Sequence, residues 1–551
     1  MEMDDLGAVL AYHQRTKHQP RAMAAGPAGL DWSNQPDPFR RYQGAPCFML
    51  ARQGFSTAAD ESYSGAPLCL ESLSEFFFES LAISGRKGFA GSSWPLRVNP
   101  SSGNLHPIEA YLIAGPLAWR GGGEVATSGD GIRNDAPAIS HGSPALYHYA
   151  PQSHSLETLA RVTEQSWERL GLPAGTVLLA FSSIYWREAW KYGERAFRYC
   201  MLDAGHALAA AALAAGCLGW RLSLQEGIGR QELAGLLGLN LPGRPQAESG
   251  EEEQPVMLVS IFTDGLAHDT SIHSGSLSLL EIVPLPSRPN SLSPRHVSWP
   301  AIDLVARASD KPPYQETDFE VHMNSAARNA VLSGYRPLLR RRRSAQAMDG
   351  RSVMPLSAFQ SILRAVLPEL PPGQSLPWRP CVHPVFFVHR VEGLSTGLYI
   401  LLRDEGQKEC LLQAMRQDFV WQRPSRIAED QPFYLLAQGD SRLSARAASC
   451  RQEIASDGCF AAAMIARFGE PLKRYGPRFY PRLLWECGVM GQALYLAAEA
   501  EGFQGCGIGC FFDDMVHDML GLSGLQYQDL YHFTVGRARI DSRILDLPPY
   551  E

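Results

Sequence analysis

The chain has 551 residues, and at roughly 100–200 residues per domain this length predicts two to four domains rather than one core. Apolar residues make up 45% of the chain, which also holds 11 Trp, 23 Phe and 19 Tyr, so wholesale disorder is excluded. The formal net charge of −7 argues against a general nucleic-acid-binding protein.

Cysteine usage and the N-terminal residues predict a soluble protein of a reducing, cytoplasmic compartment. The 11 cysteines are too scattered for a disulfide framework, and no C-x-x-C occurs. Cys506 and Cys510 lie four positions apart without a nearby His, so no metal site is expected. The acidic first residues lack the apolar stretch of a signal peptide. The uncharged run 204–220 is of borderline length for a membrane span and predicts a buried helix, so no membrane partner is expected.

The apolar periodicity predicts one order of elements twice: helix, loop, strand, strand, long helix, short helix and strand. In the first half we expect helices over 71–84 and 195–218 and strands over 108–114 and 256–262. In the second half we expect helices over 356–366 and 478–500 and strands over 385–389 and 531–536. Because regular βαβ spacing is scarce, the pattern favours the α+β class over a doubly wound sheet.

The two halves also align with each other. Residues 192–239 align without gaps onto 475–522, an offset of 283 at which twelve of 48 positions are identical. Gly205 falls on Gly488, Asp203 falls on Glu486, and the pair His106-Pro107 precedes a strand as His383-Pro384 does. Two unrelated alanine-rich helices are the alternative, but the shared register of the glycines favours duplication. Two copies of one domain are expected to form a pseudo-dimer within the chain.

The composition places the boundaries of these copies. We expect an N-terminal extension over 1–60, a first domain over 61–281, a Pro- and Ser-rich linker over 282–325, and a second domain over 326–551. Two inserts, 120–143 and 241–255, have the composition of solvated loops.

The clearest local motif is the loop at 99–107, which leads into the strand at 108–114. Ser101, Ser102, Gly103 and Asn104 offer backbone N–H groups and short polar side chains that can surround a phosphate or the edge of a planar ring. A plain turn before a strand is the alternative, since these are turn residues.

Three motifs of the second half suit an anionic or planar ligand. Arg342, Arg343 and Ser344 end an arginine run that suits phosphate, although a solvated helix face or a nucleic-acid patch has the same composition. The segment 505–510 is rich in glycine, so its backbone can approach a ligand closely, but it is no Rossmann fingerprint. Arg537 and Arg539 follow the last predicted strand, where a surface role is the alternative.

Lys191 and Tyr192 are the candidates for acid–base chemistry. The chain has only six lysines, and Lys191 stands among aromatic residues, where partial desolvation can turn an amine into a base. A lysine that snorkels from a helix terminus is the alternative. Asp203 and His206, one helical turn apart, are interpreted as a buried structural pair.

Taken together, these motifs resemble the nitroreductase-like flavoenzymes. The loop at 100–107, Arg342-Arg343-Ser344, the segment 505–509 and the run 536–539 are similar to the flavin-contacting segments of that superfamily. The runs 146–149, 191–195 and 203–206 are similar to its SagB-type dehydrogenases, which include the azoline oxidases that form thiazoles and oxazoles, and the residues before position 43 resemble the start of tandem members.

The resemblance implies FMN, a mixed and mainly antiparallel sheet flanked by helices, and flavin sites at a dimer interface that borrow residues from both subunits. The copies retain complementary parts, because the first keeps the loop and the second keeps the phosphate clamp. We therefore expect one composite FMN site per chain. The expected cofactor-binding residues are Ser101, Ser102, Gly103, Asn104, His106, Arg342, Arg343, Ser344, Gly505, Gly507, Ile508, Gly509, Arg537 and Arg539.

For function, the resemblance implies hydride transfer from an azoline-like, peptide-borne or other small substrate to flavin N5. Lys191 would take the substrate proton and Tyr192 would be its proton partner. Two alternatives stay open: an NAD(P)H-dependent nitro- or quinone-reductase, and a binding or scaffold protein without flavin. The substrate, the electron acceptor, other biosynthetic enzymes as partners, and a monomer or a higher homo-oligomer are left open as well.

Overall fold

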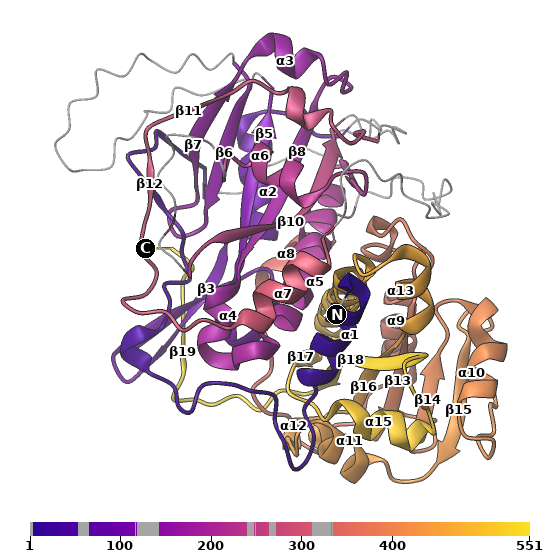
Figure 1. Ribbon diagram of the computed structural model, residues 1–551. Coiled ribbons are helices and arrows are strands. Elements are labelled where there is room, and N and C mark those ends of the chain that lie inside the picture. The colour runs from indigo at the N-terminus through magenta and orange to yellow at the C-terminus, as the bar shows by residue number, and fades with distance from the viewer. Residues whose placement is uncertain are drawn as a thin grey trace.

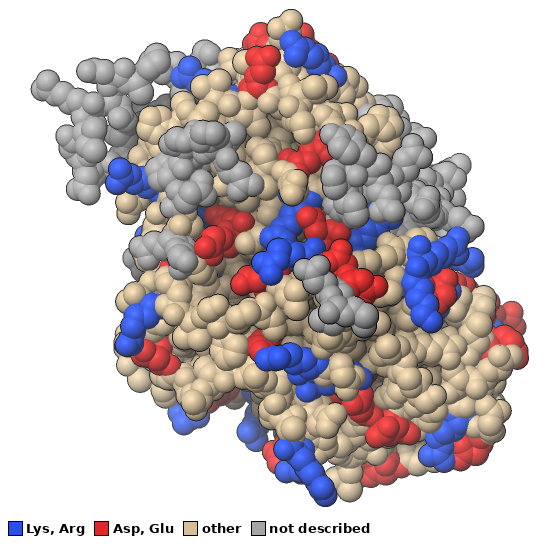
Figure 2. Space-filling model, in the orientation of Figure 1, with Lys and Arg blue, Asp and Glu red and all other residues tan. Residues whose placement is uncertain are grey.

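A computed structural model describes residues 4–52, 65–115, 117, 143–239, 247, 250–263, 271–310, 332 and 334–550. Much of the two expected inserts, and residues 311–325 of the expected linker, lie outside these ranges. Figure 1 shows the first half, in purple and magenta, beside the second half, in orange and yellow. Figure 2 shows acidic and basic side chains intermixed on the visible face.

The first half is built on an antiparallel sheet in the order β11-β7-β6-β5-β8-β10-β9, with β2 also paired to β7. Its strands are β2 (Cys47–Met49), β5 (Ile108–Ala114), β6 (Ala145–Ala150), β7 (Ser155–Val162), β8 (Thr176–Ile184), β9 (Arg221–Leu224), β10 (Glu253–Phe262) and β11 (Ile282–Pro284). Its helices include α2 (Leu70–Ser80), α3 (Glu164–Glu168), α4 (Tyr185–Tyr192), α5 (Ala196–Cys217) and α6 (Arg230–Leu236).

The second half repeats this architecture, with an antiparallel sheet in the order β15-β14-β13-β16-β18-β17. Its strands are β13 (Val382–Val388), β14 (Gly397–Leu401), β15 (Phe433–Gln438), β16 (Phe460–Arg467), β17 (Gln504–Ile508) and β18 (Tyr527–Gly536). Its helices are α8 (Tyr335–Arg341), α9 (Leu356–Ala365), α10 (Lys408–Ala414), α11 (Arg442–Ala448), α12 (Glu453–Asp457), α13 (Gly469–Tyr475), α14 (Phe479–Ala500) and α15 (Asp513–Leu520). The matching strand orders confirm the prediction of a duplicated α+β fold.

The two halves meet where α5 crosses α14. A Cβ on Gly205 would overlap the carbonyl oxygen of Trp485, and a Cβ on Gly488 would overlap that of Leu202. Both contacts join positions related by the sequence offset of 283, so each half makes the same contact with the other. This reciprocity is the signature of an isologous interface, and it confirms the expected pseudo-dimer.

Helix α5 lies in the core, as the run 204–220 predicts. The stretch Tyr185–Cys217 is long and apolar enough to cross a membrane by length and composition alone, but 89% of its most apolar window is buried inside the fold. Both α5 and α14 bury nearly their whole length, because each packs on its own sheet and on the other helix.

Several predicted elements differ from the structure. The helix expected over 71–84 ends at Ser80, because the chain reverses and forms β3 (Ile83–Phe89), which pairs with β4 (Ser92–Arg97) and with the C-terminal β19 (Leu545–Leu547). No strand was expected in the glycine-rich segment 505–510, yet β17 is the edge strand beside β18.

The Pro- and Ser-rich segment after residue 282 is partly regular structure. Strand β11 pairs with β7, β12 (Arg288–Pro289) pairs with β1 (Tyr42–Gln43), and α7 (Pro300–Ala308) packs on α1 (Asp5–Arg15). Helix α1 in turn contacts the second half, where His13 Nε2 lies 3.0 Å from Gln528 Oε1. The N-terminal extension thus bridges both halves.

Candidate functional site

A cavity of about 730 Å³ lies between the halves. The first half contributes the β3–β4 hairpin and the loop at 99–106, and the second half contributes residues 341–346, Glu499, Gln504, and the C-terminal residues 537–546. Expected site residues of both copies therefore line one space: Ser101, Asn104, His106, Arg342, Arg343, Ser344, Arg537 and Arg539. This volume is within the range of small-molecule and cofactor sites.

Arg342 is a buried cation without a carboxylate partner among the described residues. Its side chain is 3% exposed, its Nε donates to Val98 O at 3.0 Å, and its Nη2 donates to Arg97 O at 3.0 Å. Burial lowers the pKa of Arg342 to about 10. A buried guanidinium bonded only to neutral groups is a favourable place for an anion.

Arg97 adds a second buried positive charge to the lining of the cavity. It is also 3% exposed, and burial lowers the pKa of Arg97 to about 10. Arg343, which donates to Ser84 O at 2.6 Å, lies next to Arg342 and lowers its pKa further. The exposed Arg537 and Arg539 complete the rim of the cavity.

Three buried polar atoms of cavity-lining residues have no hydrogen-bond partner in the described part of the chain. They are Arg97 Nε, Asn99 Oδ1 and His106 Nδ1. Burial and the neighbouring Arg97 hold the pKa of His106 well below its usual value, so the ring is neutral. Such atoms cost free energy unless a ligand bonds to them. The donor set therefore fits a polar ligand with an anionic end, such as a flavin mononucleotide.

The loop owes its shape to a buried carboxylate and to positive φ angles. Asp203 accepts hydrogen bonds from Ser102 N and Ser102 Oγ, both at 3.1 Å, and Gly103 and Asn104 both have φ of 60°. Burial raises the pKa of Asp203 to about 7. In the second half Glu486 takes the same role, since it accepts from Cys381 N at 3.2 Å and from Val382 N at 3.1 Å.

The interpretation of Asp203 and His206 as a pair is wrong. His206 Nδ1 lies 3.3 Å from Gln492 Oε1, and His206 Nε2 lies 3.2 Å from the Tyr531 hydroxyl. The two residues lie one turn apart on α5, but Asp203 bonds to the loop at Ser102, whereas His206 contacts residues of the second half.

Lys191 and Tyr192 come to the same loop from α4. A Cβ on Gly103 would lie 3.1 Å from Lys191 Nζ and 2.8 Å from the Tyr192 hydroxyl, so both polar groups converge on the place that glycine leaves open. The Tyr192 ring lies 4.5 Å from the Tyr199 ring, centroid to centroid. Burial raises the pKa of Tyr192 well above its usual value.

Glu188 is a residue that the sequence reasoning missed. It is fully buried one turn before Lys191 on α4, and Ser101 Oγ lies 3.5 Å from its Oε1. Burial, together with nearby Asp203, raises the pKa of Glu188 well above its usual value. The spacing of three between Glu188 and Lys191 is a signal that the sequence offered.

The glycine-rich segment lies between aromatic hydroxyls that the sequence reasoning also missed. The Tyr199 hydroxyl donates to Gly509 O at 3.0 Å, and the Tyr495 hydroxyl accepts from Gly507 N at 2.8 Å. Tyr495 also meets Ser344 Oγ at 2.8 Å, which joins the segment to the arginine run. Gly505 joins it as well, because its carbonyl accepts from Ala345 N at 2.9 Å. No local sequence signal identifies these tyrosines, since their partners come from other elements.

The place related to this site by pseudo-symmetry is filled. Arg482 stands where Tyr199 stands, Glu226 stands where Gly509 stands, and Arg482 Nε donates to Glu226 Oε2 at 2.6 Å. Only about 70 Å³ of cavity remains beside this ion pair. In the loop, Trp378 takes the place of Ser101 and packs edge-on against Phe479.

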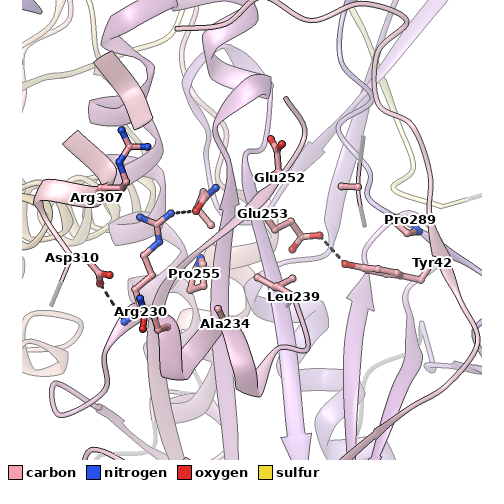
Figure 3. Close-up of a pocket in the computed structure, with 13 residues that line it drawn as sticks. Tyr42, Arg230, Ala234, Leu239, Glu252, Glu253, Pro255, Pro289, Arg307 and Asp310 are labelled. Carbon is pink, nitrogen blue, oxygen red and sulfur yellow. Dashed lines mark hydrogen bonds between the residues drawn. The ribbon is translucent and has the colours of Figure 1, made fainter. Parts of the chain in front are cut away.

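A further cavity, of about 380 Å³, lies within the first half (Figure 3). Its polar groups bond to one another: the Tyr42 hydroxyl donates to Glu253 Oε1 at 2.8 Å, and Arg230 N donates to Asp310 Oδ1 at 3.2 Å. Among the described residues that line it, no buried side-chain polar atom lacks a partner. The cavity between the halves is therefore the better candidate.

Comparisons with known proteins agree with this architecture. Residues 339–537 match the nitroreductase family. The chain is 26% identical over 152 residues to the inferred nitroreductase MJ1384 of Methanocaldococcus jannaschii, a match that covers 26% of this chain and 61% of that relative's length.

Solved structures extend the similarity to the whole chain. A nitroreductase-like protein of Anabaena variabilis, known from its crystal structure, has a TM-score of 0.67 at 22% identity and covers 97% of this chain and 99% of its own. A chain of the E. coli microcin synthetase McbBCD complex has a TM-score of 0.26 at 20% identity over 49% of this chain and 95% of its own, too low to separate branches of the fold. The fold is that of two tandem nitroreductase-like domains, as predicted.

Proposed function

We propose that the chain is a cytoplasmic, FMN-dependent oxidoreductase of the SagB dehydrogenase type, with one FMN per chain. The observation that carries the proposal is the cavity between the halves, where the buried Arg342 has no carboxylate partner among the described residues. An anion bound there would offset the charge, and the phosphate of FMN would be such an anion.

Each half would hold a different part of the cofactor. Arg342, Arg343, Ser344, Arg537 and Arg539 would bind the phosphate. The loop from Ser101 to His106, with Ser102, Gly103 and Asn104, would contact the ring system from one side. Gly505, Gly507, Ile508 and Gly509 would approach it with their backbone. When bound, FMN supplies a hydride acceptor at its N5.

Residues of the chain would then take up the proton that the substrate loses. Lys191 Nζ would accept the proton that the substrate loses, because it converges with the Tyr192 hydroxyl beside the loop. The buried Glu188 lies one turn away on the same helix, and burial, together with Asp203, raises its pKa well above the usual value. The substrate would be an azoline-like group, on a peptide or a small molecule, and other biosynthetic enzymes would supply it.

Flavin content and turnover test the proposal together. The purified chain is expected to hold one FMN, because the second place is filled by Arg482 and Glu226. Two FMN per chain would contradict the composite site, and a colourless protein that never retains FMN would support a scaffold instead.

The acid–base assignment has its own test. Lys191→Ala is expected to keep FMN bound and to lose roughly 10²- to 10⁴-fold in turnover of a thiazoline-bearing peptide, the usual contribution of a general base. Lys408→Ala, on α10 in the second half, is the matched control and should behave as the wild type. Unchanged turnover in Lys191→Ala would move the base to another residue.

A nitro- or quinone-reductase is the second candidate, favoured because one relative similar in sequence and one similar in structure are named as nitroreductases. Rapid bleaching of the bound flavin by NADPH, followed by turnover of a nitro compound, would support it over the dehydrogenase.

A further inference from the structure

Two cysteines face each other next to the glycine-rich segment. Cys450 lies in the turn between α11 and α12, and Cys510 directly follows Gly509. Their sulfur atoms are 2.8 Å apart. We propose that Cys450 and Cys510 are a redox-active dithiol, which a peroxide converts into a disulfide and a thiol reductant restores.

The backbone holds this pair in place on both sides. Phe512 N donates to Ala448 O at 2.7 Å, and Gln452 Nε2 donates to Cys510 O at 2.9 Å. These bonds join the two segments immediately before and after the cysteines. A disulfide can therefore form without moving either segment far, which is the geometric condition for cross-linking two cysteines.

The two thiols are chemically unequal. A hydrogen bond joins the two sulfur atoms, and this contact, with the nearby Arg195, lowers the pKa of Cys510, while the same contact and burial raise the pKa of Cys450. Both residues are half-buried, so a small oxidant can reach them. A stabilised thiolate beside a second cysteine is the arrangement found in redox-sensing pairs.

Cys506 and Cys410 serve as a comparison. Cys506, on β17, has its pKa raised to about 12 by burial, and Cys410 is exposed on α10. Hydrogen bonding and charge therefore single out Cys510 as the nucleophile.

The proposed chemistry balances in two steps. The Cys510 thiolate attacks one oxygen of hydrogen peroxide, the O–O bond breaks, hydroxide leaves, and Cys510 becomes a sulfenic acid. The Cys450 sulfur then attacks the Cys510 sulfur, the S–O bond breaks and water leaves. The two thiols lose two electrons and the peroxide gains them, and a dithiol such as dithiothreitol returns them by exchange.

The position of the pair links it to the candidate site. The Gly509 carbonyl, one residue before Cys510, accepts from the Tyr199 hydroxyl, and the Tyr199 ring contacts that of Tyr192. A disulfide would fix the segment whose Gly509 carbonyl holds Tyr199 beside Tyr192. The inference does not rest on the proposed flavin chemistry, because added peroxide acts equally on the protein without FMN.

The test uses the full chain, reduced and freed of reductant, with and without FMN. One equivalent of hydrogen peroxide is added, free thiols are blocked with N-ethylmaleimide, and the peptides are mapped without reduction. We expect two free thiols fewer than the 11 of the reduced chain and one cross-linked peptide that joins Cys450 to Cys510. Dithiothreitol should restore both thiols.

Variants distinguish the cysteine that reacts with peroxide, Cys510, from the cysteine that then forms the disulfide, Cys450. Cys450→Ser is expected to stop at a sulfenic acid on Cys510, which dimedone traps, and Cys510→Ser should react with peroxide at least 10-fold more slowly at Cys450. Cys410→Ser is the matched control and should cross-link as the wild type does. A wild-type map without the Cys450–Cys510 peptide, or one in which Cys410 is oxidised first, would overturn the proposal whatever the variants do.

Discussion

Replacing Arg342 by methionine distinguishes a cofactor clamp from a structural arginine. Methionine keeps much of the side-chain volume and removes the charge and the donors. If Arg342 is present for a phosphate, the change should weaken FMN binding and leave the stability of the FMN-free protein nearly unaltered.

The magnitudes follow from the contacts of Arg342. Burial lowers the pKa of Arg342 from 12.5 to about 10, which corresponds to roughly 3 kcal/mol of cost for the buried charge. The variant regains this cost but loses the bonds to Val98 O and Arg97 O, at roughly 1.5 kcal/mol or more each. The two effects nearly cancel. One lost charge-assisted contact with phosphate, roughly 1.5–3 kcal/mol, weakens FMN binding by about 10- to 150-fold.

The matched control is Arg403→Met in the second half. Arg403 is 5% exposed and bonds to the carbonyl oxygens of Val366 and Val382, but it also forms an ion pair with Glu486. Its loss leaves Glu486 buried without its cation, which costs about 3–5 kcal/mol of stability. FMN binding to whatever remains folded should be unchanged.

The assay combines urea unfolding of the FMN-free proteins with titration of FMN by fluorescence quenching. The expected result is a crossed pattern, in which Arg342→Met loses affinity and Arg403→Met loses stability. The reasoning would be refuted if Arg342→Met were destabilised by 3 kcal/mol or more, in the way expected of Arg403→Met at about 3–5 kcal/mol, and still bound FMN normally.

Two further predictions concern the interior. Burial raises the pKa of Asp203 to about 7. The folded state therefore keeps a proton on Asp203 that the unfolded state releases from about pH 4. The free energy of unfolding should fall by roughly 4 kcal/mol as the pH rises from 4 to 7. Asp203→Asn should flatten this dependence in urea unfolding at pH 5 and pH 8; an unchanged slope would place the titration elsewhere. Gly205→Ala should cost roughly 1–3 kcal/mol in thermal unfolding, since its Cβ meets backbone of the other half. Gly235→Ala, on α6 with no atom within 4 Å of its Cβ, should be neutral or stabilising; equal losses would contradict the packing argument.

The local sequence pattern predicted the bounds of a helix or strand well where contacts with other elements do not shift those bounds. The strand at 108–114 has the predicted limits, and the helix at 356–366 ends one residue early, because apolar periodicity and flanking turns define both. The helix predicted over 71–84 continued too far because no glycine or proline interrupts the chain before Gly85. Its end is set by β3, whose partner β19 lies at the opposite end of the sequence.

The sequence by itself determined the duplication, since glycines in register over 48 residues need no structure to be seen. It also determined which polar motifs each copy keeps. Only the tertiary structure decided which groups meet: α5 and α14 cross at Gly205 and Gly488, and that crossing brings the loop of one half to the arginines of the other. The partners of a charge or a thiol are set by distances of a few ångströms. The order of residues therefore shows neither that Arg342 has no carboxylate partner in the described part of the chain nor that Cys450 meets Cys510.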